Sequence, residues 1–305
     1  MTAATANAVR RGPSPIERIG RFLDRYLLLI YTGLAVLYLM LPVIVIALFS
    51  FNDPAGRTNF TWQSFTLDAW LDPFGIPGLG ESVFISLALA LGSTIVATAL
   101  GTMIAIGLAR YQFRGRSASN FFIFLPMATP EIVLGASLLT MFVAIGNPPF
   151  FPTGFVTILI AHIMFNISYV VVTVRARLAG FPIHLEEAAM DLGATPWTTF
   201  WKVTFPLILP GITAAALLAF SLSIDDFVIT NFTGGIYTQT FPMFIYAKNR
   251  IGIPPEVNVI GTVIFFAAVS LVALSVLAQR RRLGRDSAPS VAFLDLHKKR
   301  PQGES

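Results

Sequence analysis

The chain has 305 residues, of which 55% are hydrophobic and only 12% are charged, and its mean hydropathy is +0.71. A soluble domain carries about 25% charged residues, so this composition excludes an ordinary soluble protein and indicates an integral membrane protein. The net charge of +5 comes largely from basic residues beside apolar runs and does not indicate a nucleic-acid partner, and the absence of cysteine excludes disulfides, thiol catalysis and cysteine-held metal sites.

Six stretches are long and apolar enough to cross a bilayer, which takes about 20 such residues. They predict an all-α, polytopic membrane protein with six transmembrane helices. The first stretch is too long for the apolar part of a typical signal peptide and no Ala-x-Ala site follows it, so we expect it to be retained. The stretches are Leu27–Phe49, Ser82–Ala109, Ser119–Ile145, Gly154–Val174, Pro206–Ile229 and Asn258–Ala278.

Basic residues gather on one side of these six spans. They lie in the N-terminal segment, in the second-to-third and fourth-to-fifth connections, and after the last span. The positive-inside rule therefore predicts that both termini are cytoplasmic. We expect a cytoplasmic segment at 1–26, a transmembrane domain at 27–278 and a cytoplasmic tail at 279–305, whose polar composition favours disorder.

Small residues recur every fourth position in the second span, at Ala97, Gly101, Ala105 and Ala109. Such a row lets two helix backbones approach closely. It is compatible both with an interface to another subunit and with tight packing inside this chain.

Acidic residues inside the spans are costly in a bilayer and are typical of functional sites. Glu131 follows Pro126 and Pro130 in the third span, where two prolines weaken the helix and free carbonyl groups. Asp225 and Asp226 lie near the outer end of the fifth span. Three acids and no base within these spans favour a cationic solute. A hydrogen bond to the broken helix for Glu131, and an ordinary helix end for the two aspartates, are the structural alternatives.

A polar segment at 181–206 separates the fourth and fifth spans and has the pattern of a helical hairpin. Its first part predicts a short helix with one apolar stripe, because four apolar residues follow the i, i+3, i+4, i+7 spacing. A helix lying among lipid headgroups would carry the same stripe, but such helices prefer basic residues on the polar face. Here the polar face is acidic. The stripe is Leu185, Ala188, Ala189 and Leu192, and the acids are Glu186, Glu187 and Asp191.

The second part of this segment predicts a turn and a second helix. Gly193 suits the left-handed residue that commonly closes a helix. Thr195 suits an N-cap, and Pro196 suits the first residue of the next helix. Pro206 marks the start of the fifth span, where its missing N–H costs nothing.

The hairpin resembles the EAA loop of ABC-importer permeases, in which two short helices joined at a glycine dock into an ATPase subunit. The departures from the family pattern are mild, with Val203 and Phe205 standing where the family usually has Ile and Leu. The resemblance implies a type I permease fold in which the hairpin couples ATP use to transport. The residues to which it assigns this coupling are Glu187, Ala188, Ala189, Gly193 and Pro206.

Three further runs, at 125–135, 223–229 and 254–258, resemble the permeases of spermidine/putrescine importers, most closely the second of their two permease subunits. This implies a multi-pass protein of a bacterial inner membrane that forms half of a pathway for a small cationic solute such as a polyamine. Related permeases for iron, thiamine or phosphonate-type solutes are the alternative. Carboxylates and an aromatic face suit a polyammonium chain, and the pathway residues expected are Glu131, Asp225, Asp226 and Phe227.

The resemblance also implies partners, namely an ABC ATPase homodimer, a second homologous permease subunit, an extracytoplasmic solute-binding protein and membrane lipid. The chain has no Gly-x-x-x-x-Gly-Lys-Ser/Thr motif, so we expect no ATPase activity and no cofactor of its own. We expect no metal site, because the histidines are scattered, and we expect His162 to contact another helix. A membrane-integral enzyme would need a cluster of polar catalytic groups, whereas the spans of this sequence show only isolated acids. An ATP-independent channel or carrier often has two repeated halves, and this sequence lacks a clear repeat.

Overall fold

The computed structural model describes residues 15–56, 59–145, 153–180, 182–249 and 252–286. Regular structure in these ranges is helical, apart from one isolated antiparallel bridge between Asn52 and Phe65. The chain divides into two compact units, one formed by the residues before Phe74 together with those after Ile253, and the other by Phe74–Ile253. The expected all-α fold is thereby confirmed.

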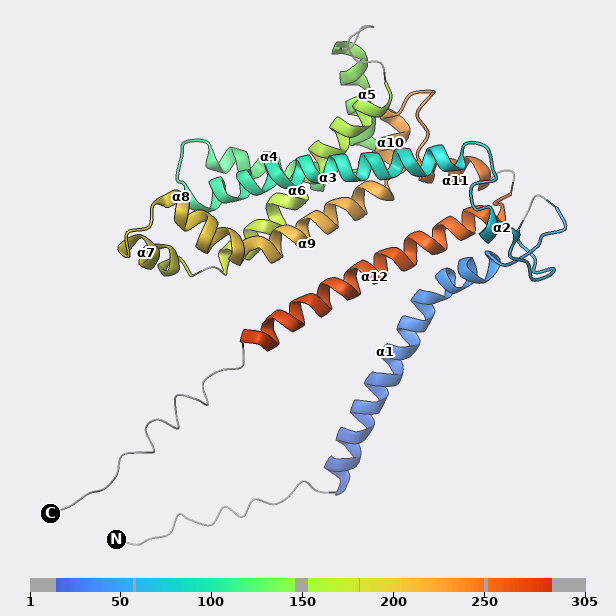
Figure 1. Ribbon diagram of the computed structural model, residues 1–305, viewed down its shortest axis with the longest axis horizontal. Coiled ribbons are helices and arrows are strands. Elements are labelled where there is room, and N and C mark those ends of the chain that lie inside the picture. Colours follow the sequence, from blue (N-terminus) through green and yellow to red (C-terminus); the bar gives the residue numbers. More distant parts are fainter. Residues whose placement is uncertain (1–14, 57–58, 146–152, 181, 250–251, 287–305) are drawn as a thin grey trace. The chain divides into compact units, whose positions relative to one another are not determined.

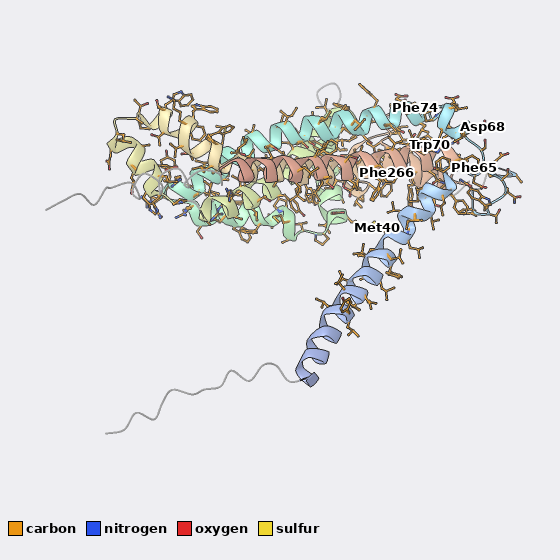
Figure 2. All side chains as sticks on the ribbon, turned by 60° about the horizontal axis from the view of Figure 1, so that its bottom comes forward. Met40, Phe65, Asp68, Trp70, Phe74 and Phe266 are labelled. Atoms are coloured by element: carbon orange, nitrogen blue, oxygen red, sulfur yellow. The ribbon has the colours of Figure 1, made fainter. Side chains whose placement is uncertain are left out.

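The first unit contains α1 (Pro15–Phe49), α2 (Asp68–Leu71) and α12 (Pro255–Asp286). Both long helices extend beyond the predicted spans, because α1 begins before Leu27 and α12 continues past Ala278. The connection after α1 is anchored by Trp70, whose ring stacks on Phe51 at 5.2 Å and whose indole N–H donates to Ser50 Oγ at 3.2 Å. Met40, Trp70 and Phe266 line an apolar groove in this unit (Figure 2).

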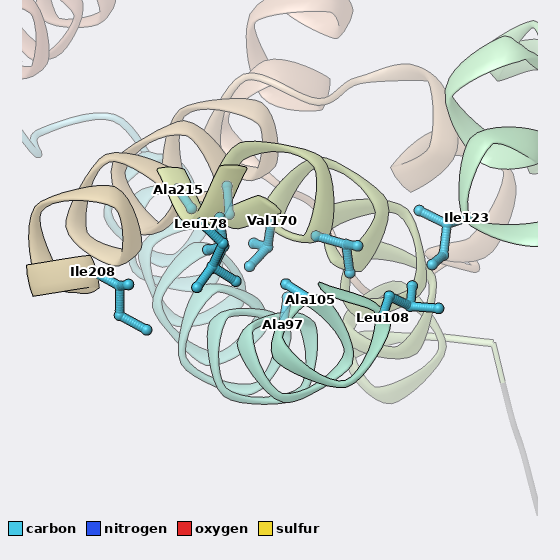
Figure 3. Packing of buried hydrophobic residues seen from close by; sticks show 11 residues of the cluster. Ala97, Ala105, Leu108, Ile123, Val170, Leu178, Ile208 and Ala215 are labelled. Carbon is cyan, nitrogen blue, oxygen red and sulfur yellow. The ribbon is translucent and has the colours of Figure 1, made fainter. Parts of the chain in front are cut away.

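The second unit is built on a bundle of α3 (Leu79–Arg110), α6 (Phe155–Ala179) and α9 (Phe205–Ile224). Buried apolar residues from the three helices, joined by Ile123, form its core (Figure 3). A Cβ at Gly101 would lie 2.7 Å from the side chain of Val170, so only glycine allows α3 and α6 to come this close. The row of small residues therefore packs inside the chain, where Ala97 and Ala105 are fully buried, while Ala109 is exposed.

The third predicted span, Ser119–Ile145, consists of two helices that are separated at Thr129 and Pro130, where the prolines were expected to weaken the helix. The chain bends by 109° between α4 (Arg116–Ala128) and α5 (Glu131–Ile145). Proline disfavours a helical conformation in the residue before it, and Thr129, which precedes Pro130, is extended with φ −82° and ψ 132°. Five helices of the described chain are long and apolar enough to cross a membrane, or six if this bent pair forms one span.

The fifth predicted span also ends earlier than expected, at Ile224 instead of Ile229. Two short helices follow, α10 (Val228–Thr233) and α11 (Phe241–Asn249). The connection before α9 contains α7 (His184–Asp191), α8 (Pro196–Thr199) and a π-helix, η1 (Phe200–Thr204). Figure 1 shows α7 and α8 at one end of the α3–α6–α9 bundle and α10 at the other.

Candidate functional site

The hairpin formed by α7 and α8 has the turn that the sequence predicts. Gly193 adopts the left-handed conformation, with φ +87°. Its N–H donates to the carbonyl of Met190 at 2.9 Å, and the N–H of Ala194 donates to the carbonyl of Ala189 at 3.0 Å. These two bonds form a Schellman motif, which closes α7 and satisfies carbonyls that its end would leave free. The space around Gly193 is open, so backbone conformation alone requires glycine there.

The second helix of the hairpin continues into the transmembrane bundle. Thr195 caps α8 by accepting a hydrogen bond from the N–H of Thr198 at 3.3 Å, and Pro196 is the first helical residue. α8 passes through η1 into α9, whose second residue is Pro206, so Pro196–Ile224 forms one helical path of 29 residues. The caps were predicted correctly. The π-helix was not, because no residue type in the sequence marks it.

Glu186 connects the hairpin to the bundle. Its Oε1 accepts a charge-assisted hydrogen bond from Arg110 Nη2 at 2.6 Å and a hydrogen bond from Thr204 Oγ1, also at 2.6 Å. Arg110 is the last residue of α3, and Thr204 is the last residue of η1. Sequence reasoning placed Glu186 on the outward polar face and missed this contact, since no spacing rule relates Arg110 to a residue so far along the chain.

The other side of the hairpin is exposed. Glu187 and Ala188 face solvent and Ala189 is half-buried. Leu192 is 90% exposed and Trp197 is 71% exposed. The rings of Trp197 and Trp201 meet edge to face with centroids 5.8 Å apart. An exposed group of large apolar side chains rimmed by acids is characteristic of a surface that binds another protein.

Arginines near the hairpin join helices as well as carrying charge. Arg175 of α6 donates to Asn120 Oδ1 of α4 at 2.7 Å. Arg177 donates to the carbonyl of Leu207 in α9 at 3.1 and 3.2 Å, and its side chain packs so closely on Gly211 that a Cβ there would lie 2.7 Å from it. The sequence indicated only their charge.

At the far end of the bundle, Asp226 is enclosed by hydrogen bonds. Its carboxylate accepts from the N–H groups of Ile229 and Thr230, from Thr230 Oγ1, and from His162 Nε2 at 3.2 Å. Two of these donors are backbone groups of the first turn of α10, so Asp226 caps that helix. Residues 225–229, which hydropathy assigned to the fifth span, therefore include the start of a separate helix, α10.

His162 extends this group into a chain of hydrogen bonds, the buried polar network. Thr230 Oγ1 uses its one hydrogen on Asp226, so its 3.0 Å contact with His162 Nε2 requires Nε2 to donate. In the neutral histidine, Nδ1 then accepts from Ser223 Oγ at 2.6 Å, and Ser223 in turn accepts from Ser93 at 2.9 Å. The network joins α3, α6, α9 and α10, which confirms the helix-contact role expected of His162. The polar residues within apolar spans were the signal for it.

The remaining predicted pathway residues lie apart from that network. Glu131 is the first residue of α5 and is exposed, and Asp225 is exposed next to the end of α9. Phe227 packs on Tyr246 of α11 with ring centroids 4.5 Å apart. Within the described ranges, no three His, Cys, Asp or Glu side chains come together as metal ligands.

Comparison with known proteins agrees with this architecture. Residues 97–285 match the family described as "Binding-protein-dependent transport system inner membrane component". The chain is 35% identical over 244 residues to the spermidine/putrescine transport system permease protein PotC of Haemophilus influenzae, covering 80% of this chain and 93% of that protein. It is 34% identical over 250 residues to the putrescine transport system permease protein PotI of Escherichia coli, covering 80% and 88%.

Solved structures share the fold at low sequence identity. A bacterial ABC transporter involved in the import of the acidic polysaccharide alginate matches with a TM-score of 0.62 at 18% identity, over 90% of this chain and all of that chain. The MetNI methionine ABC transporter matches with a TM-score of 0.51 at 20% identity, over 69% and 96%. With a family match over more than half of its length and relatives that it covers almost end to end, the chain belongs to the binding-protein-dependent transport system inner membrane components, the permease subunits of ABC importers.

Proposed function

We propose that this chain forms half of the translocation pathway of an ATP-driven importer for polyamines, and that the hairpin of α7 and α8 receives the mechanical work. The observation that carries the proposal is the two-sided hairpin, whose Glu186 bonds to α3 and η1 while Leu192 and Trp197 stand exposed. The named substrates of PotC and PotI favour spermidine or putrescine as the solute. Iron, thiamine and phosphonate-type solutes remain the alternative class.

The shape of the hairpin supports a mechanical role. An ATPase dimer that closes on ATP would press on α7 and α8. Because α8 continues through η1 into α9, displacement of α8 is delivered along one helix to Ile224, beside Ser223 of the buried polar network and exposed Asp225. The assembly that fits this role has two permease subunits, an ATPase homodimer and an external solute-binding protein.

The charge distribution supports an orientation. Arg110, Arg175 and Arg177 all lie at the hairpin end of the bundle. The positive-inside rule assigns that end to the cytoplasm, where the ATPase would dock. With the bent pair of α4 and α5 counted as one span, both termini are then cytoplasmic.

We expect the chain to co-purify with the ATPase subunit of its own transport system and to lose that partner on Gly193→Pro. Proline holds φ near −65°, whereas Gly193 has φ +87° and donates its N–H to Met190. Gly115→Pro is the matched control, since Gly115 also has positive φ but begins α4, outside the hairpin. Equal retention of the ATPase by both variants would contradict docking at the hairpin.

We expect Glu131→Gln and Asp225→Asn each to raise the KM for spermidine uptake about tenfold, which corresponds to about 1.4 kcal/mol. Both acids are exposed, so each substitution removes attraction for a polyammonium chain without disturbing the fold. Uptake of radiolabelled spermidine into proteoliposomes measures the change. Asp72→Asn, at an exposed acid after α2, is the control. An unchanged KM in both variants would remove these acids from the pathway.

A further inference from the structure

The two neighbouring acids of the hairpin have opposite surroundings. Glu187 is exposed, whereas the side chain of Glu186 is only 17% exposed. One oxygen of Glu186 accepts hydrogen bonds from both Arg110 and Thr204. The helix that carries them, α7, buries none of its residues. Apolar packing therefore contributes little to the contact between α7 and the bundle. The hydrogen bonds of Glu186 are a principal part of that contact.

The two partners of Glu186 belong to different helices of the bundle. Arg110 ends α3, and Thr204, which is 95% buried, ends η1 where α9 begins. We propose that Glu186 is a positioning residue that transmits the displacement of α7 to α3 and α9, through a contact we call the Arg110–Glu186–Thr204 clasp. Charge-assisted hydrogen bonds at 2.6 Å are short and strong, which suits a contact that must carry a load.

This proposal rests on the proposed function but makes a separate claim. Docking needs the exposed residues of the hairpin, while the clasp lies on its inner side. Loss of the clasp therefore leaves the ATPase bound and active, but α7 then moves without displacing α3 and α9. The quantity that changes is the number of solute molecules imported per ATP hydrolysed.

The test uses the complete transporter, with ATPase and solute-binding protein, in proteoliposomes supplied with radiolabelled spermidine. For Glu186→Ala we expect ATPase co-purification at the wild-type level and a fall of about tenfold in spermidine imported per ATP. Asp72→Ala removes an exposed acid after α2, outside the hairpin, and should leave the ratio unchanged. Wild-type coupling in Glu186→Ala would overturn the clasp, as would loss of the ATPase from that variant.

A second pair of variants tests the clasp if Glu186→Ala does not yield protein. Thr204→Val keeps the shape of the side chain and removes its hydroxyl, so we expect the same direction of change, whereas Thr204→Ser keeps the hydroxyl and should retain wild-type coupling. Identical ratios in Val and Ser variants would overturn the proposal. If the wild-type chain itself fails to bind the ATPase, the proposed function is at fault, and that result is distinct from either outcome at Glu186 or Thr204.

Discussion

Glu187→Arg is expected to abolish uptake while the chain still inserts in the membrane. Glu187 is exposed on α7, so its replacement leaves the internal contacts of the chain intact. At a surface that meets another protein, reversal of a charge costs several kcal/mol when the partner presents the opposite charge. Uptake by whole cells and ATPase co-purification from detergent extracts measure the two halves of the prediction.

A matched control separates the loss of Glu187 from the mere presence of an arginine. His184→Arg adds a positive charge to the exposed start of the same helix and leaves Glu187 in place. We expect this variant to keep at least about half of wild-type uptake. Wild-type uptake by Glu187→Arg would count against docking at α7, and poor insertion of the variant would indicate that Glu187 supports the fold instead.

Asp226→Leu is expected to destabilise the protein by about 3 kcal/mol, because removal of one member of a buried, hydrogen-bonded pair leaves its partners unsatisfied. The groups left without the carboxylate are the ring of His162, the hydroxyl of Thr230 and two N–H groups of α10. Thermal unfolding of the purified protein in detergent should occur at least about 5 °C lower than for the wild type.

The neighbouring aspartate provides the control for this variant. Asp225→Leu alters an exposed side chain and should leave the unfolding midpoint within about 1 °C of the wild type. Asp226→Asn keeps one acceptor oxygen and should fall between the two. Equal midpoints for Asp226→Leu and Asp225→Leu would mean that the buried polar network does not support the fold.

Residue preferences for helix caps and turns predicted the hairpin correctly. Gly193, Thr195 and Pro196 adopt the conformations that their types favour, and the space around Gly193 is open. Hydropathy likewise located every long helix. The caps and the approximate positions of the long helices were therefore predictable from local sequence, whereas the end of the fifth span at Ile224 was not.

Contacts between distant segments were beyond the same rules. Asp225 and Asp226 look alike in sequence, yet one is exposed and the other is enclosed by His162 and the start of α10. Glu186 and Glu187 differ in the same way because only one of them lies opposite Arg110. In α7 a rotation of about 100° between adjacent helical residues directs Glu186 inward and Glu187 outward. Asp225 and Asp226 lie in the connection between α9 and α10, where the start of α10 places donors around Asp226 alone.

The π-helix at Phe200–Thr204 sets the rotation of α9 about its axis relative to α8. One turn there contains an extra residue, so every side chain after Thr204 is rotated by about 100° from where an uninterrupted α-helix would place it. Removing one residue from this turn would therefore rotate Ser223 and the other side chains of α9 by about 100° relative to the hairpin. The direction in which each side chain of α9 points thus depends on one extra residue in the π-helical turn.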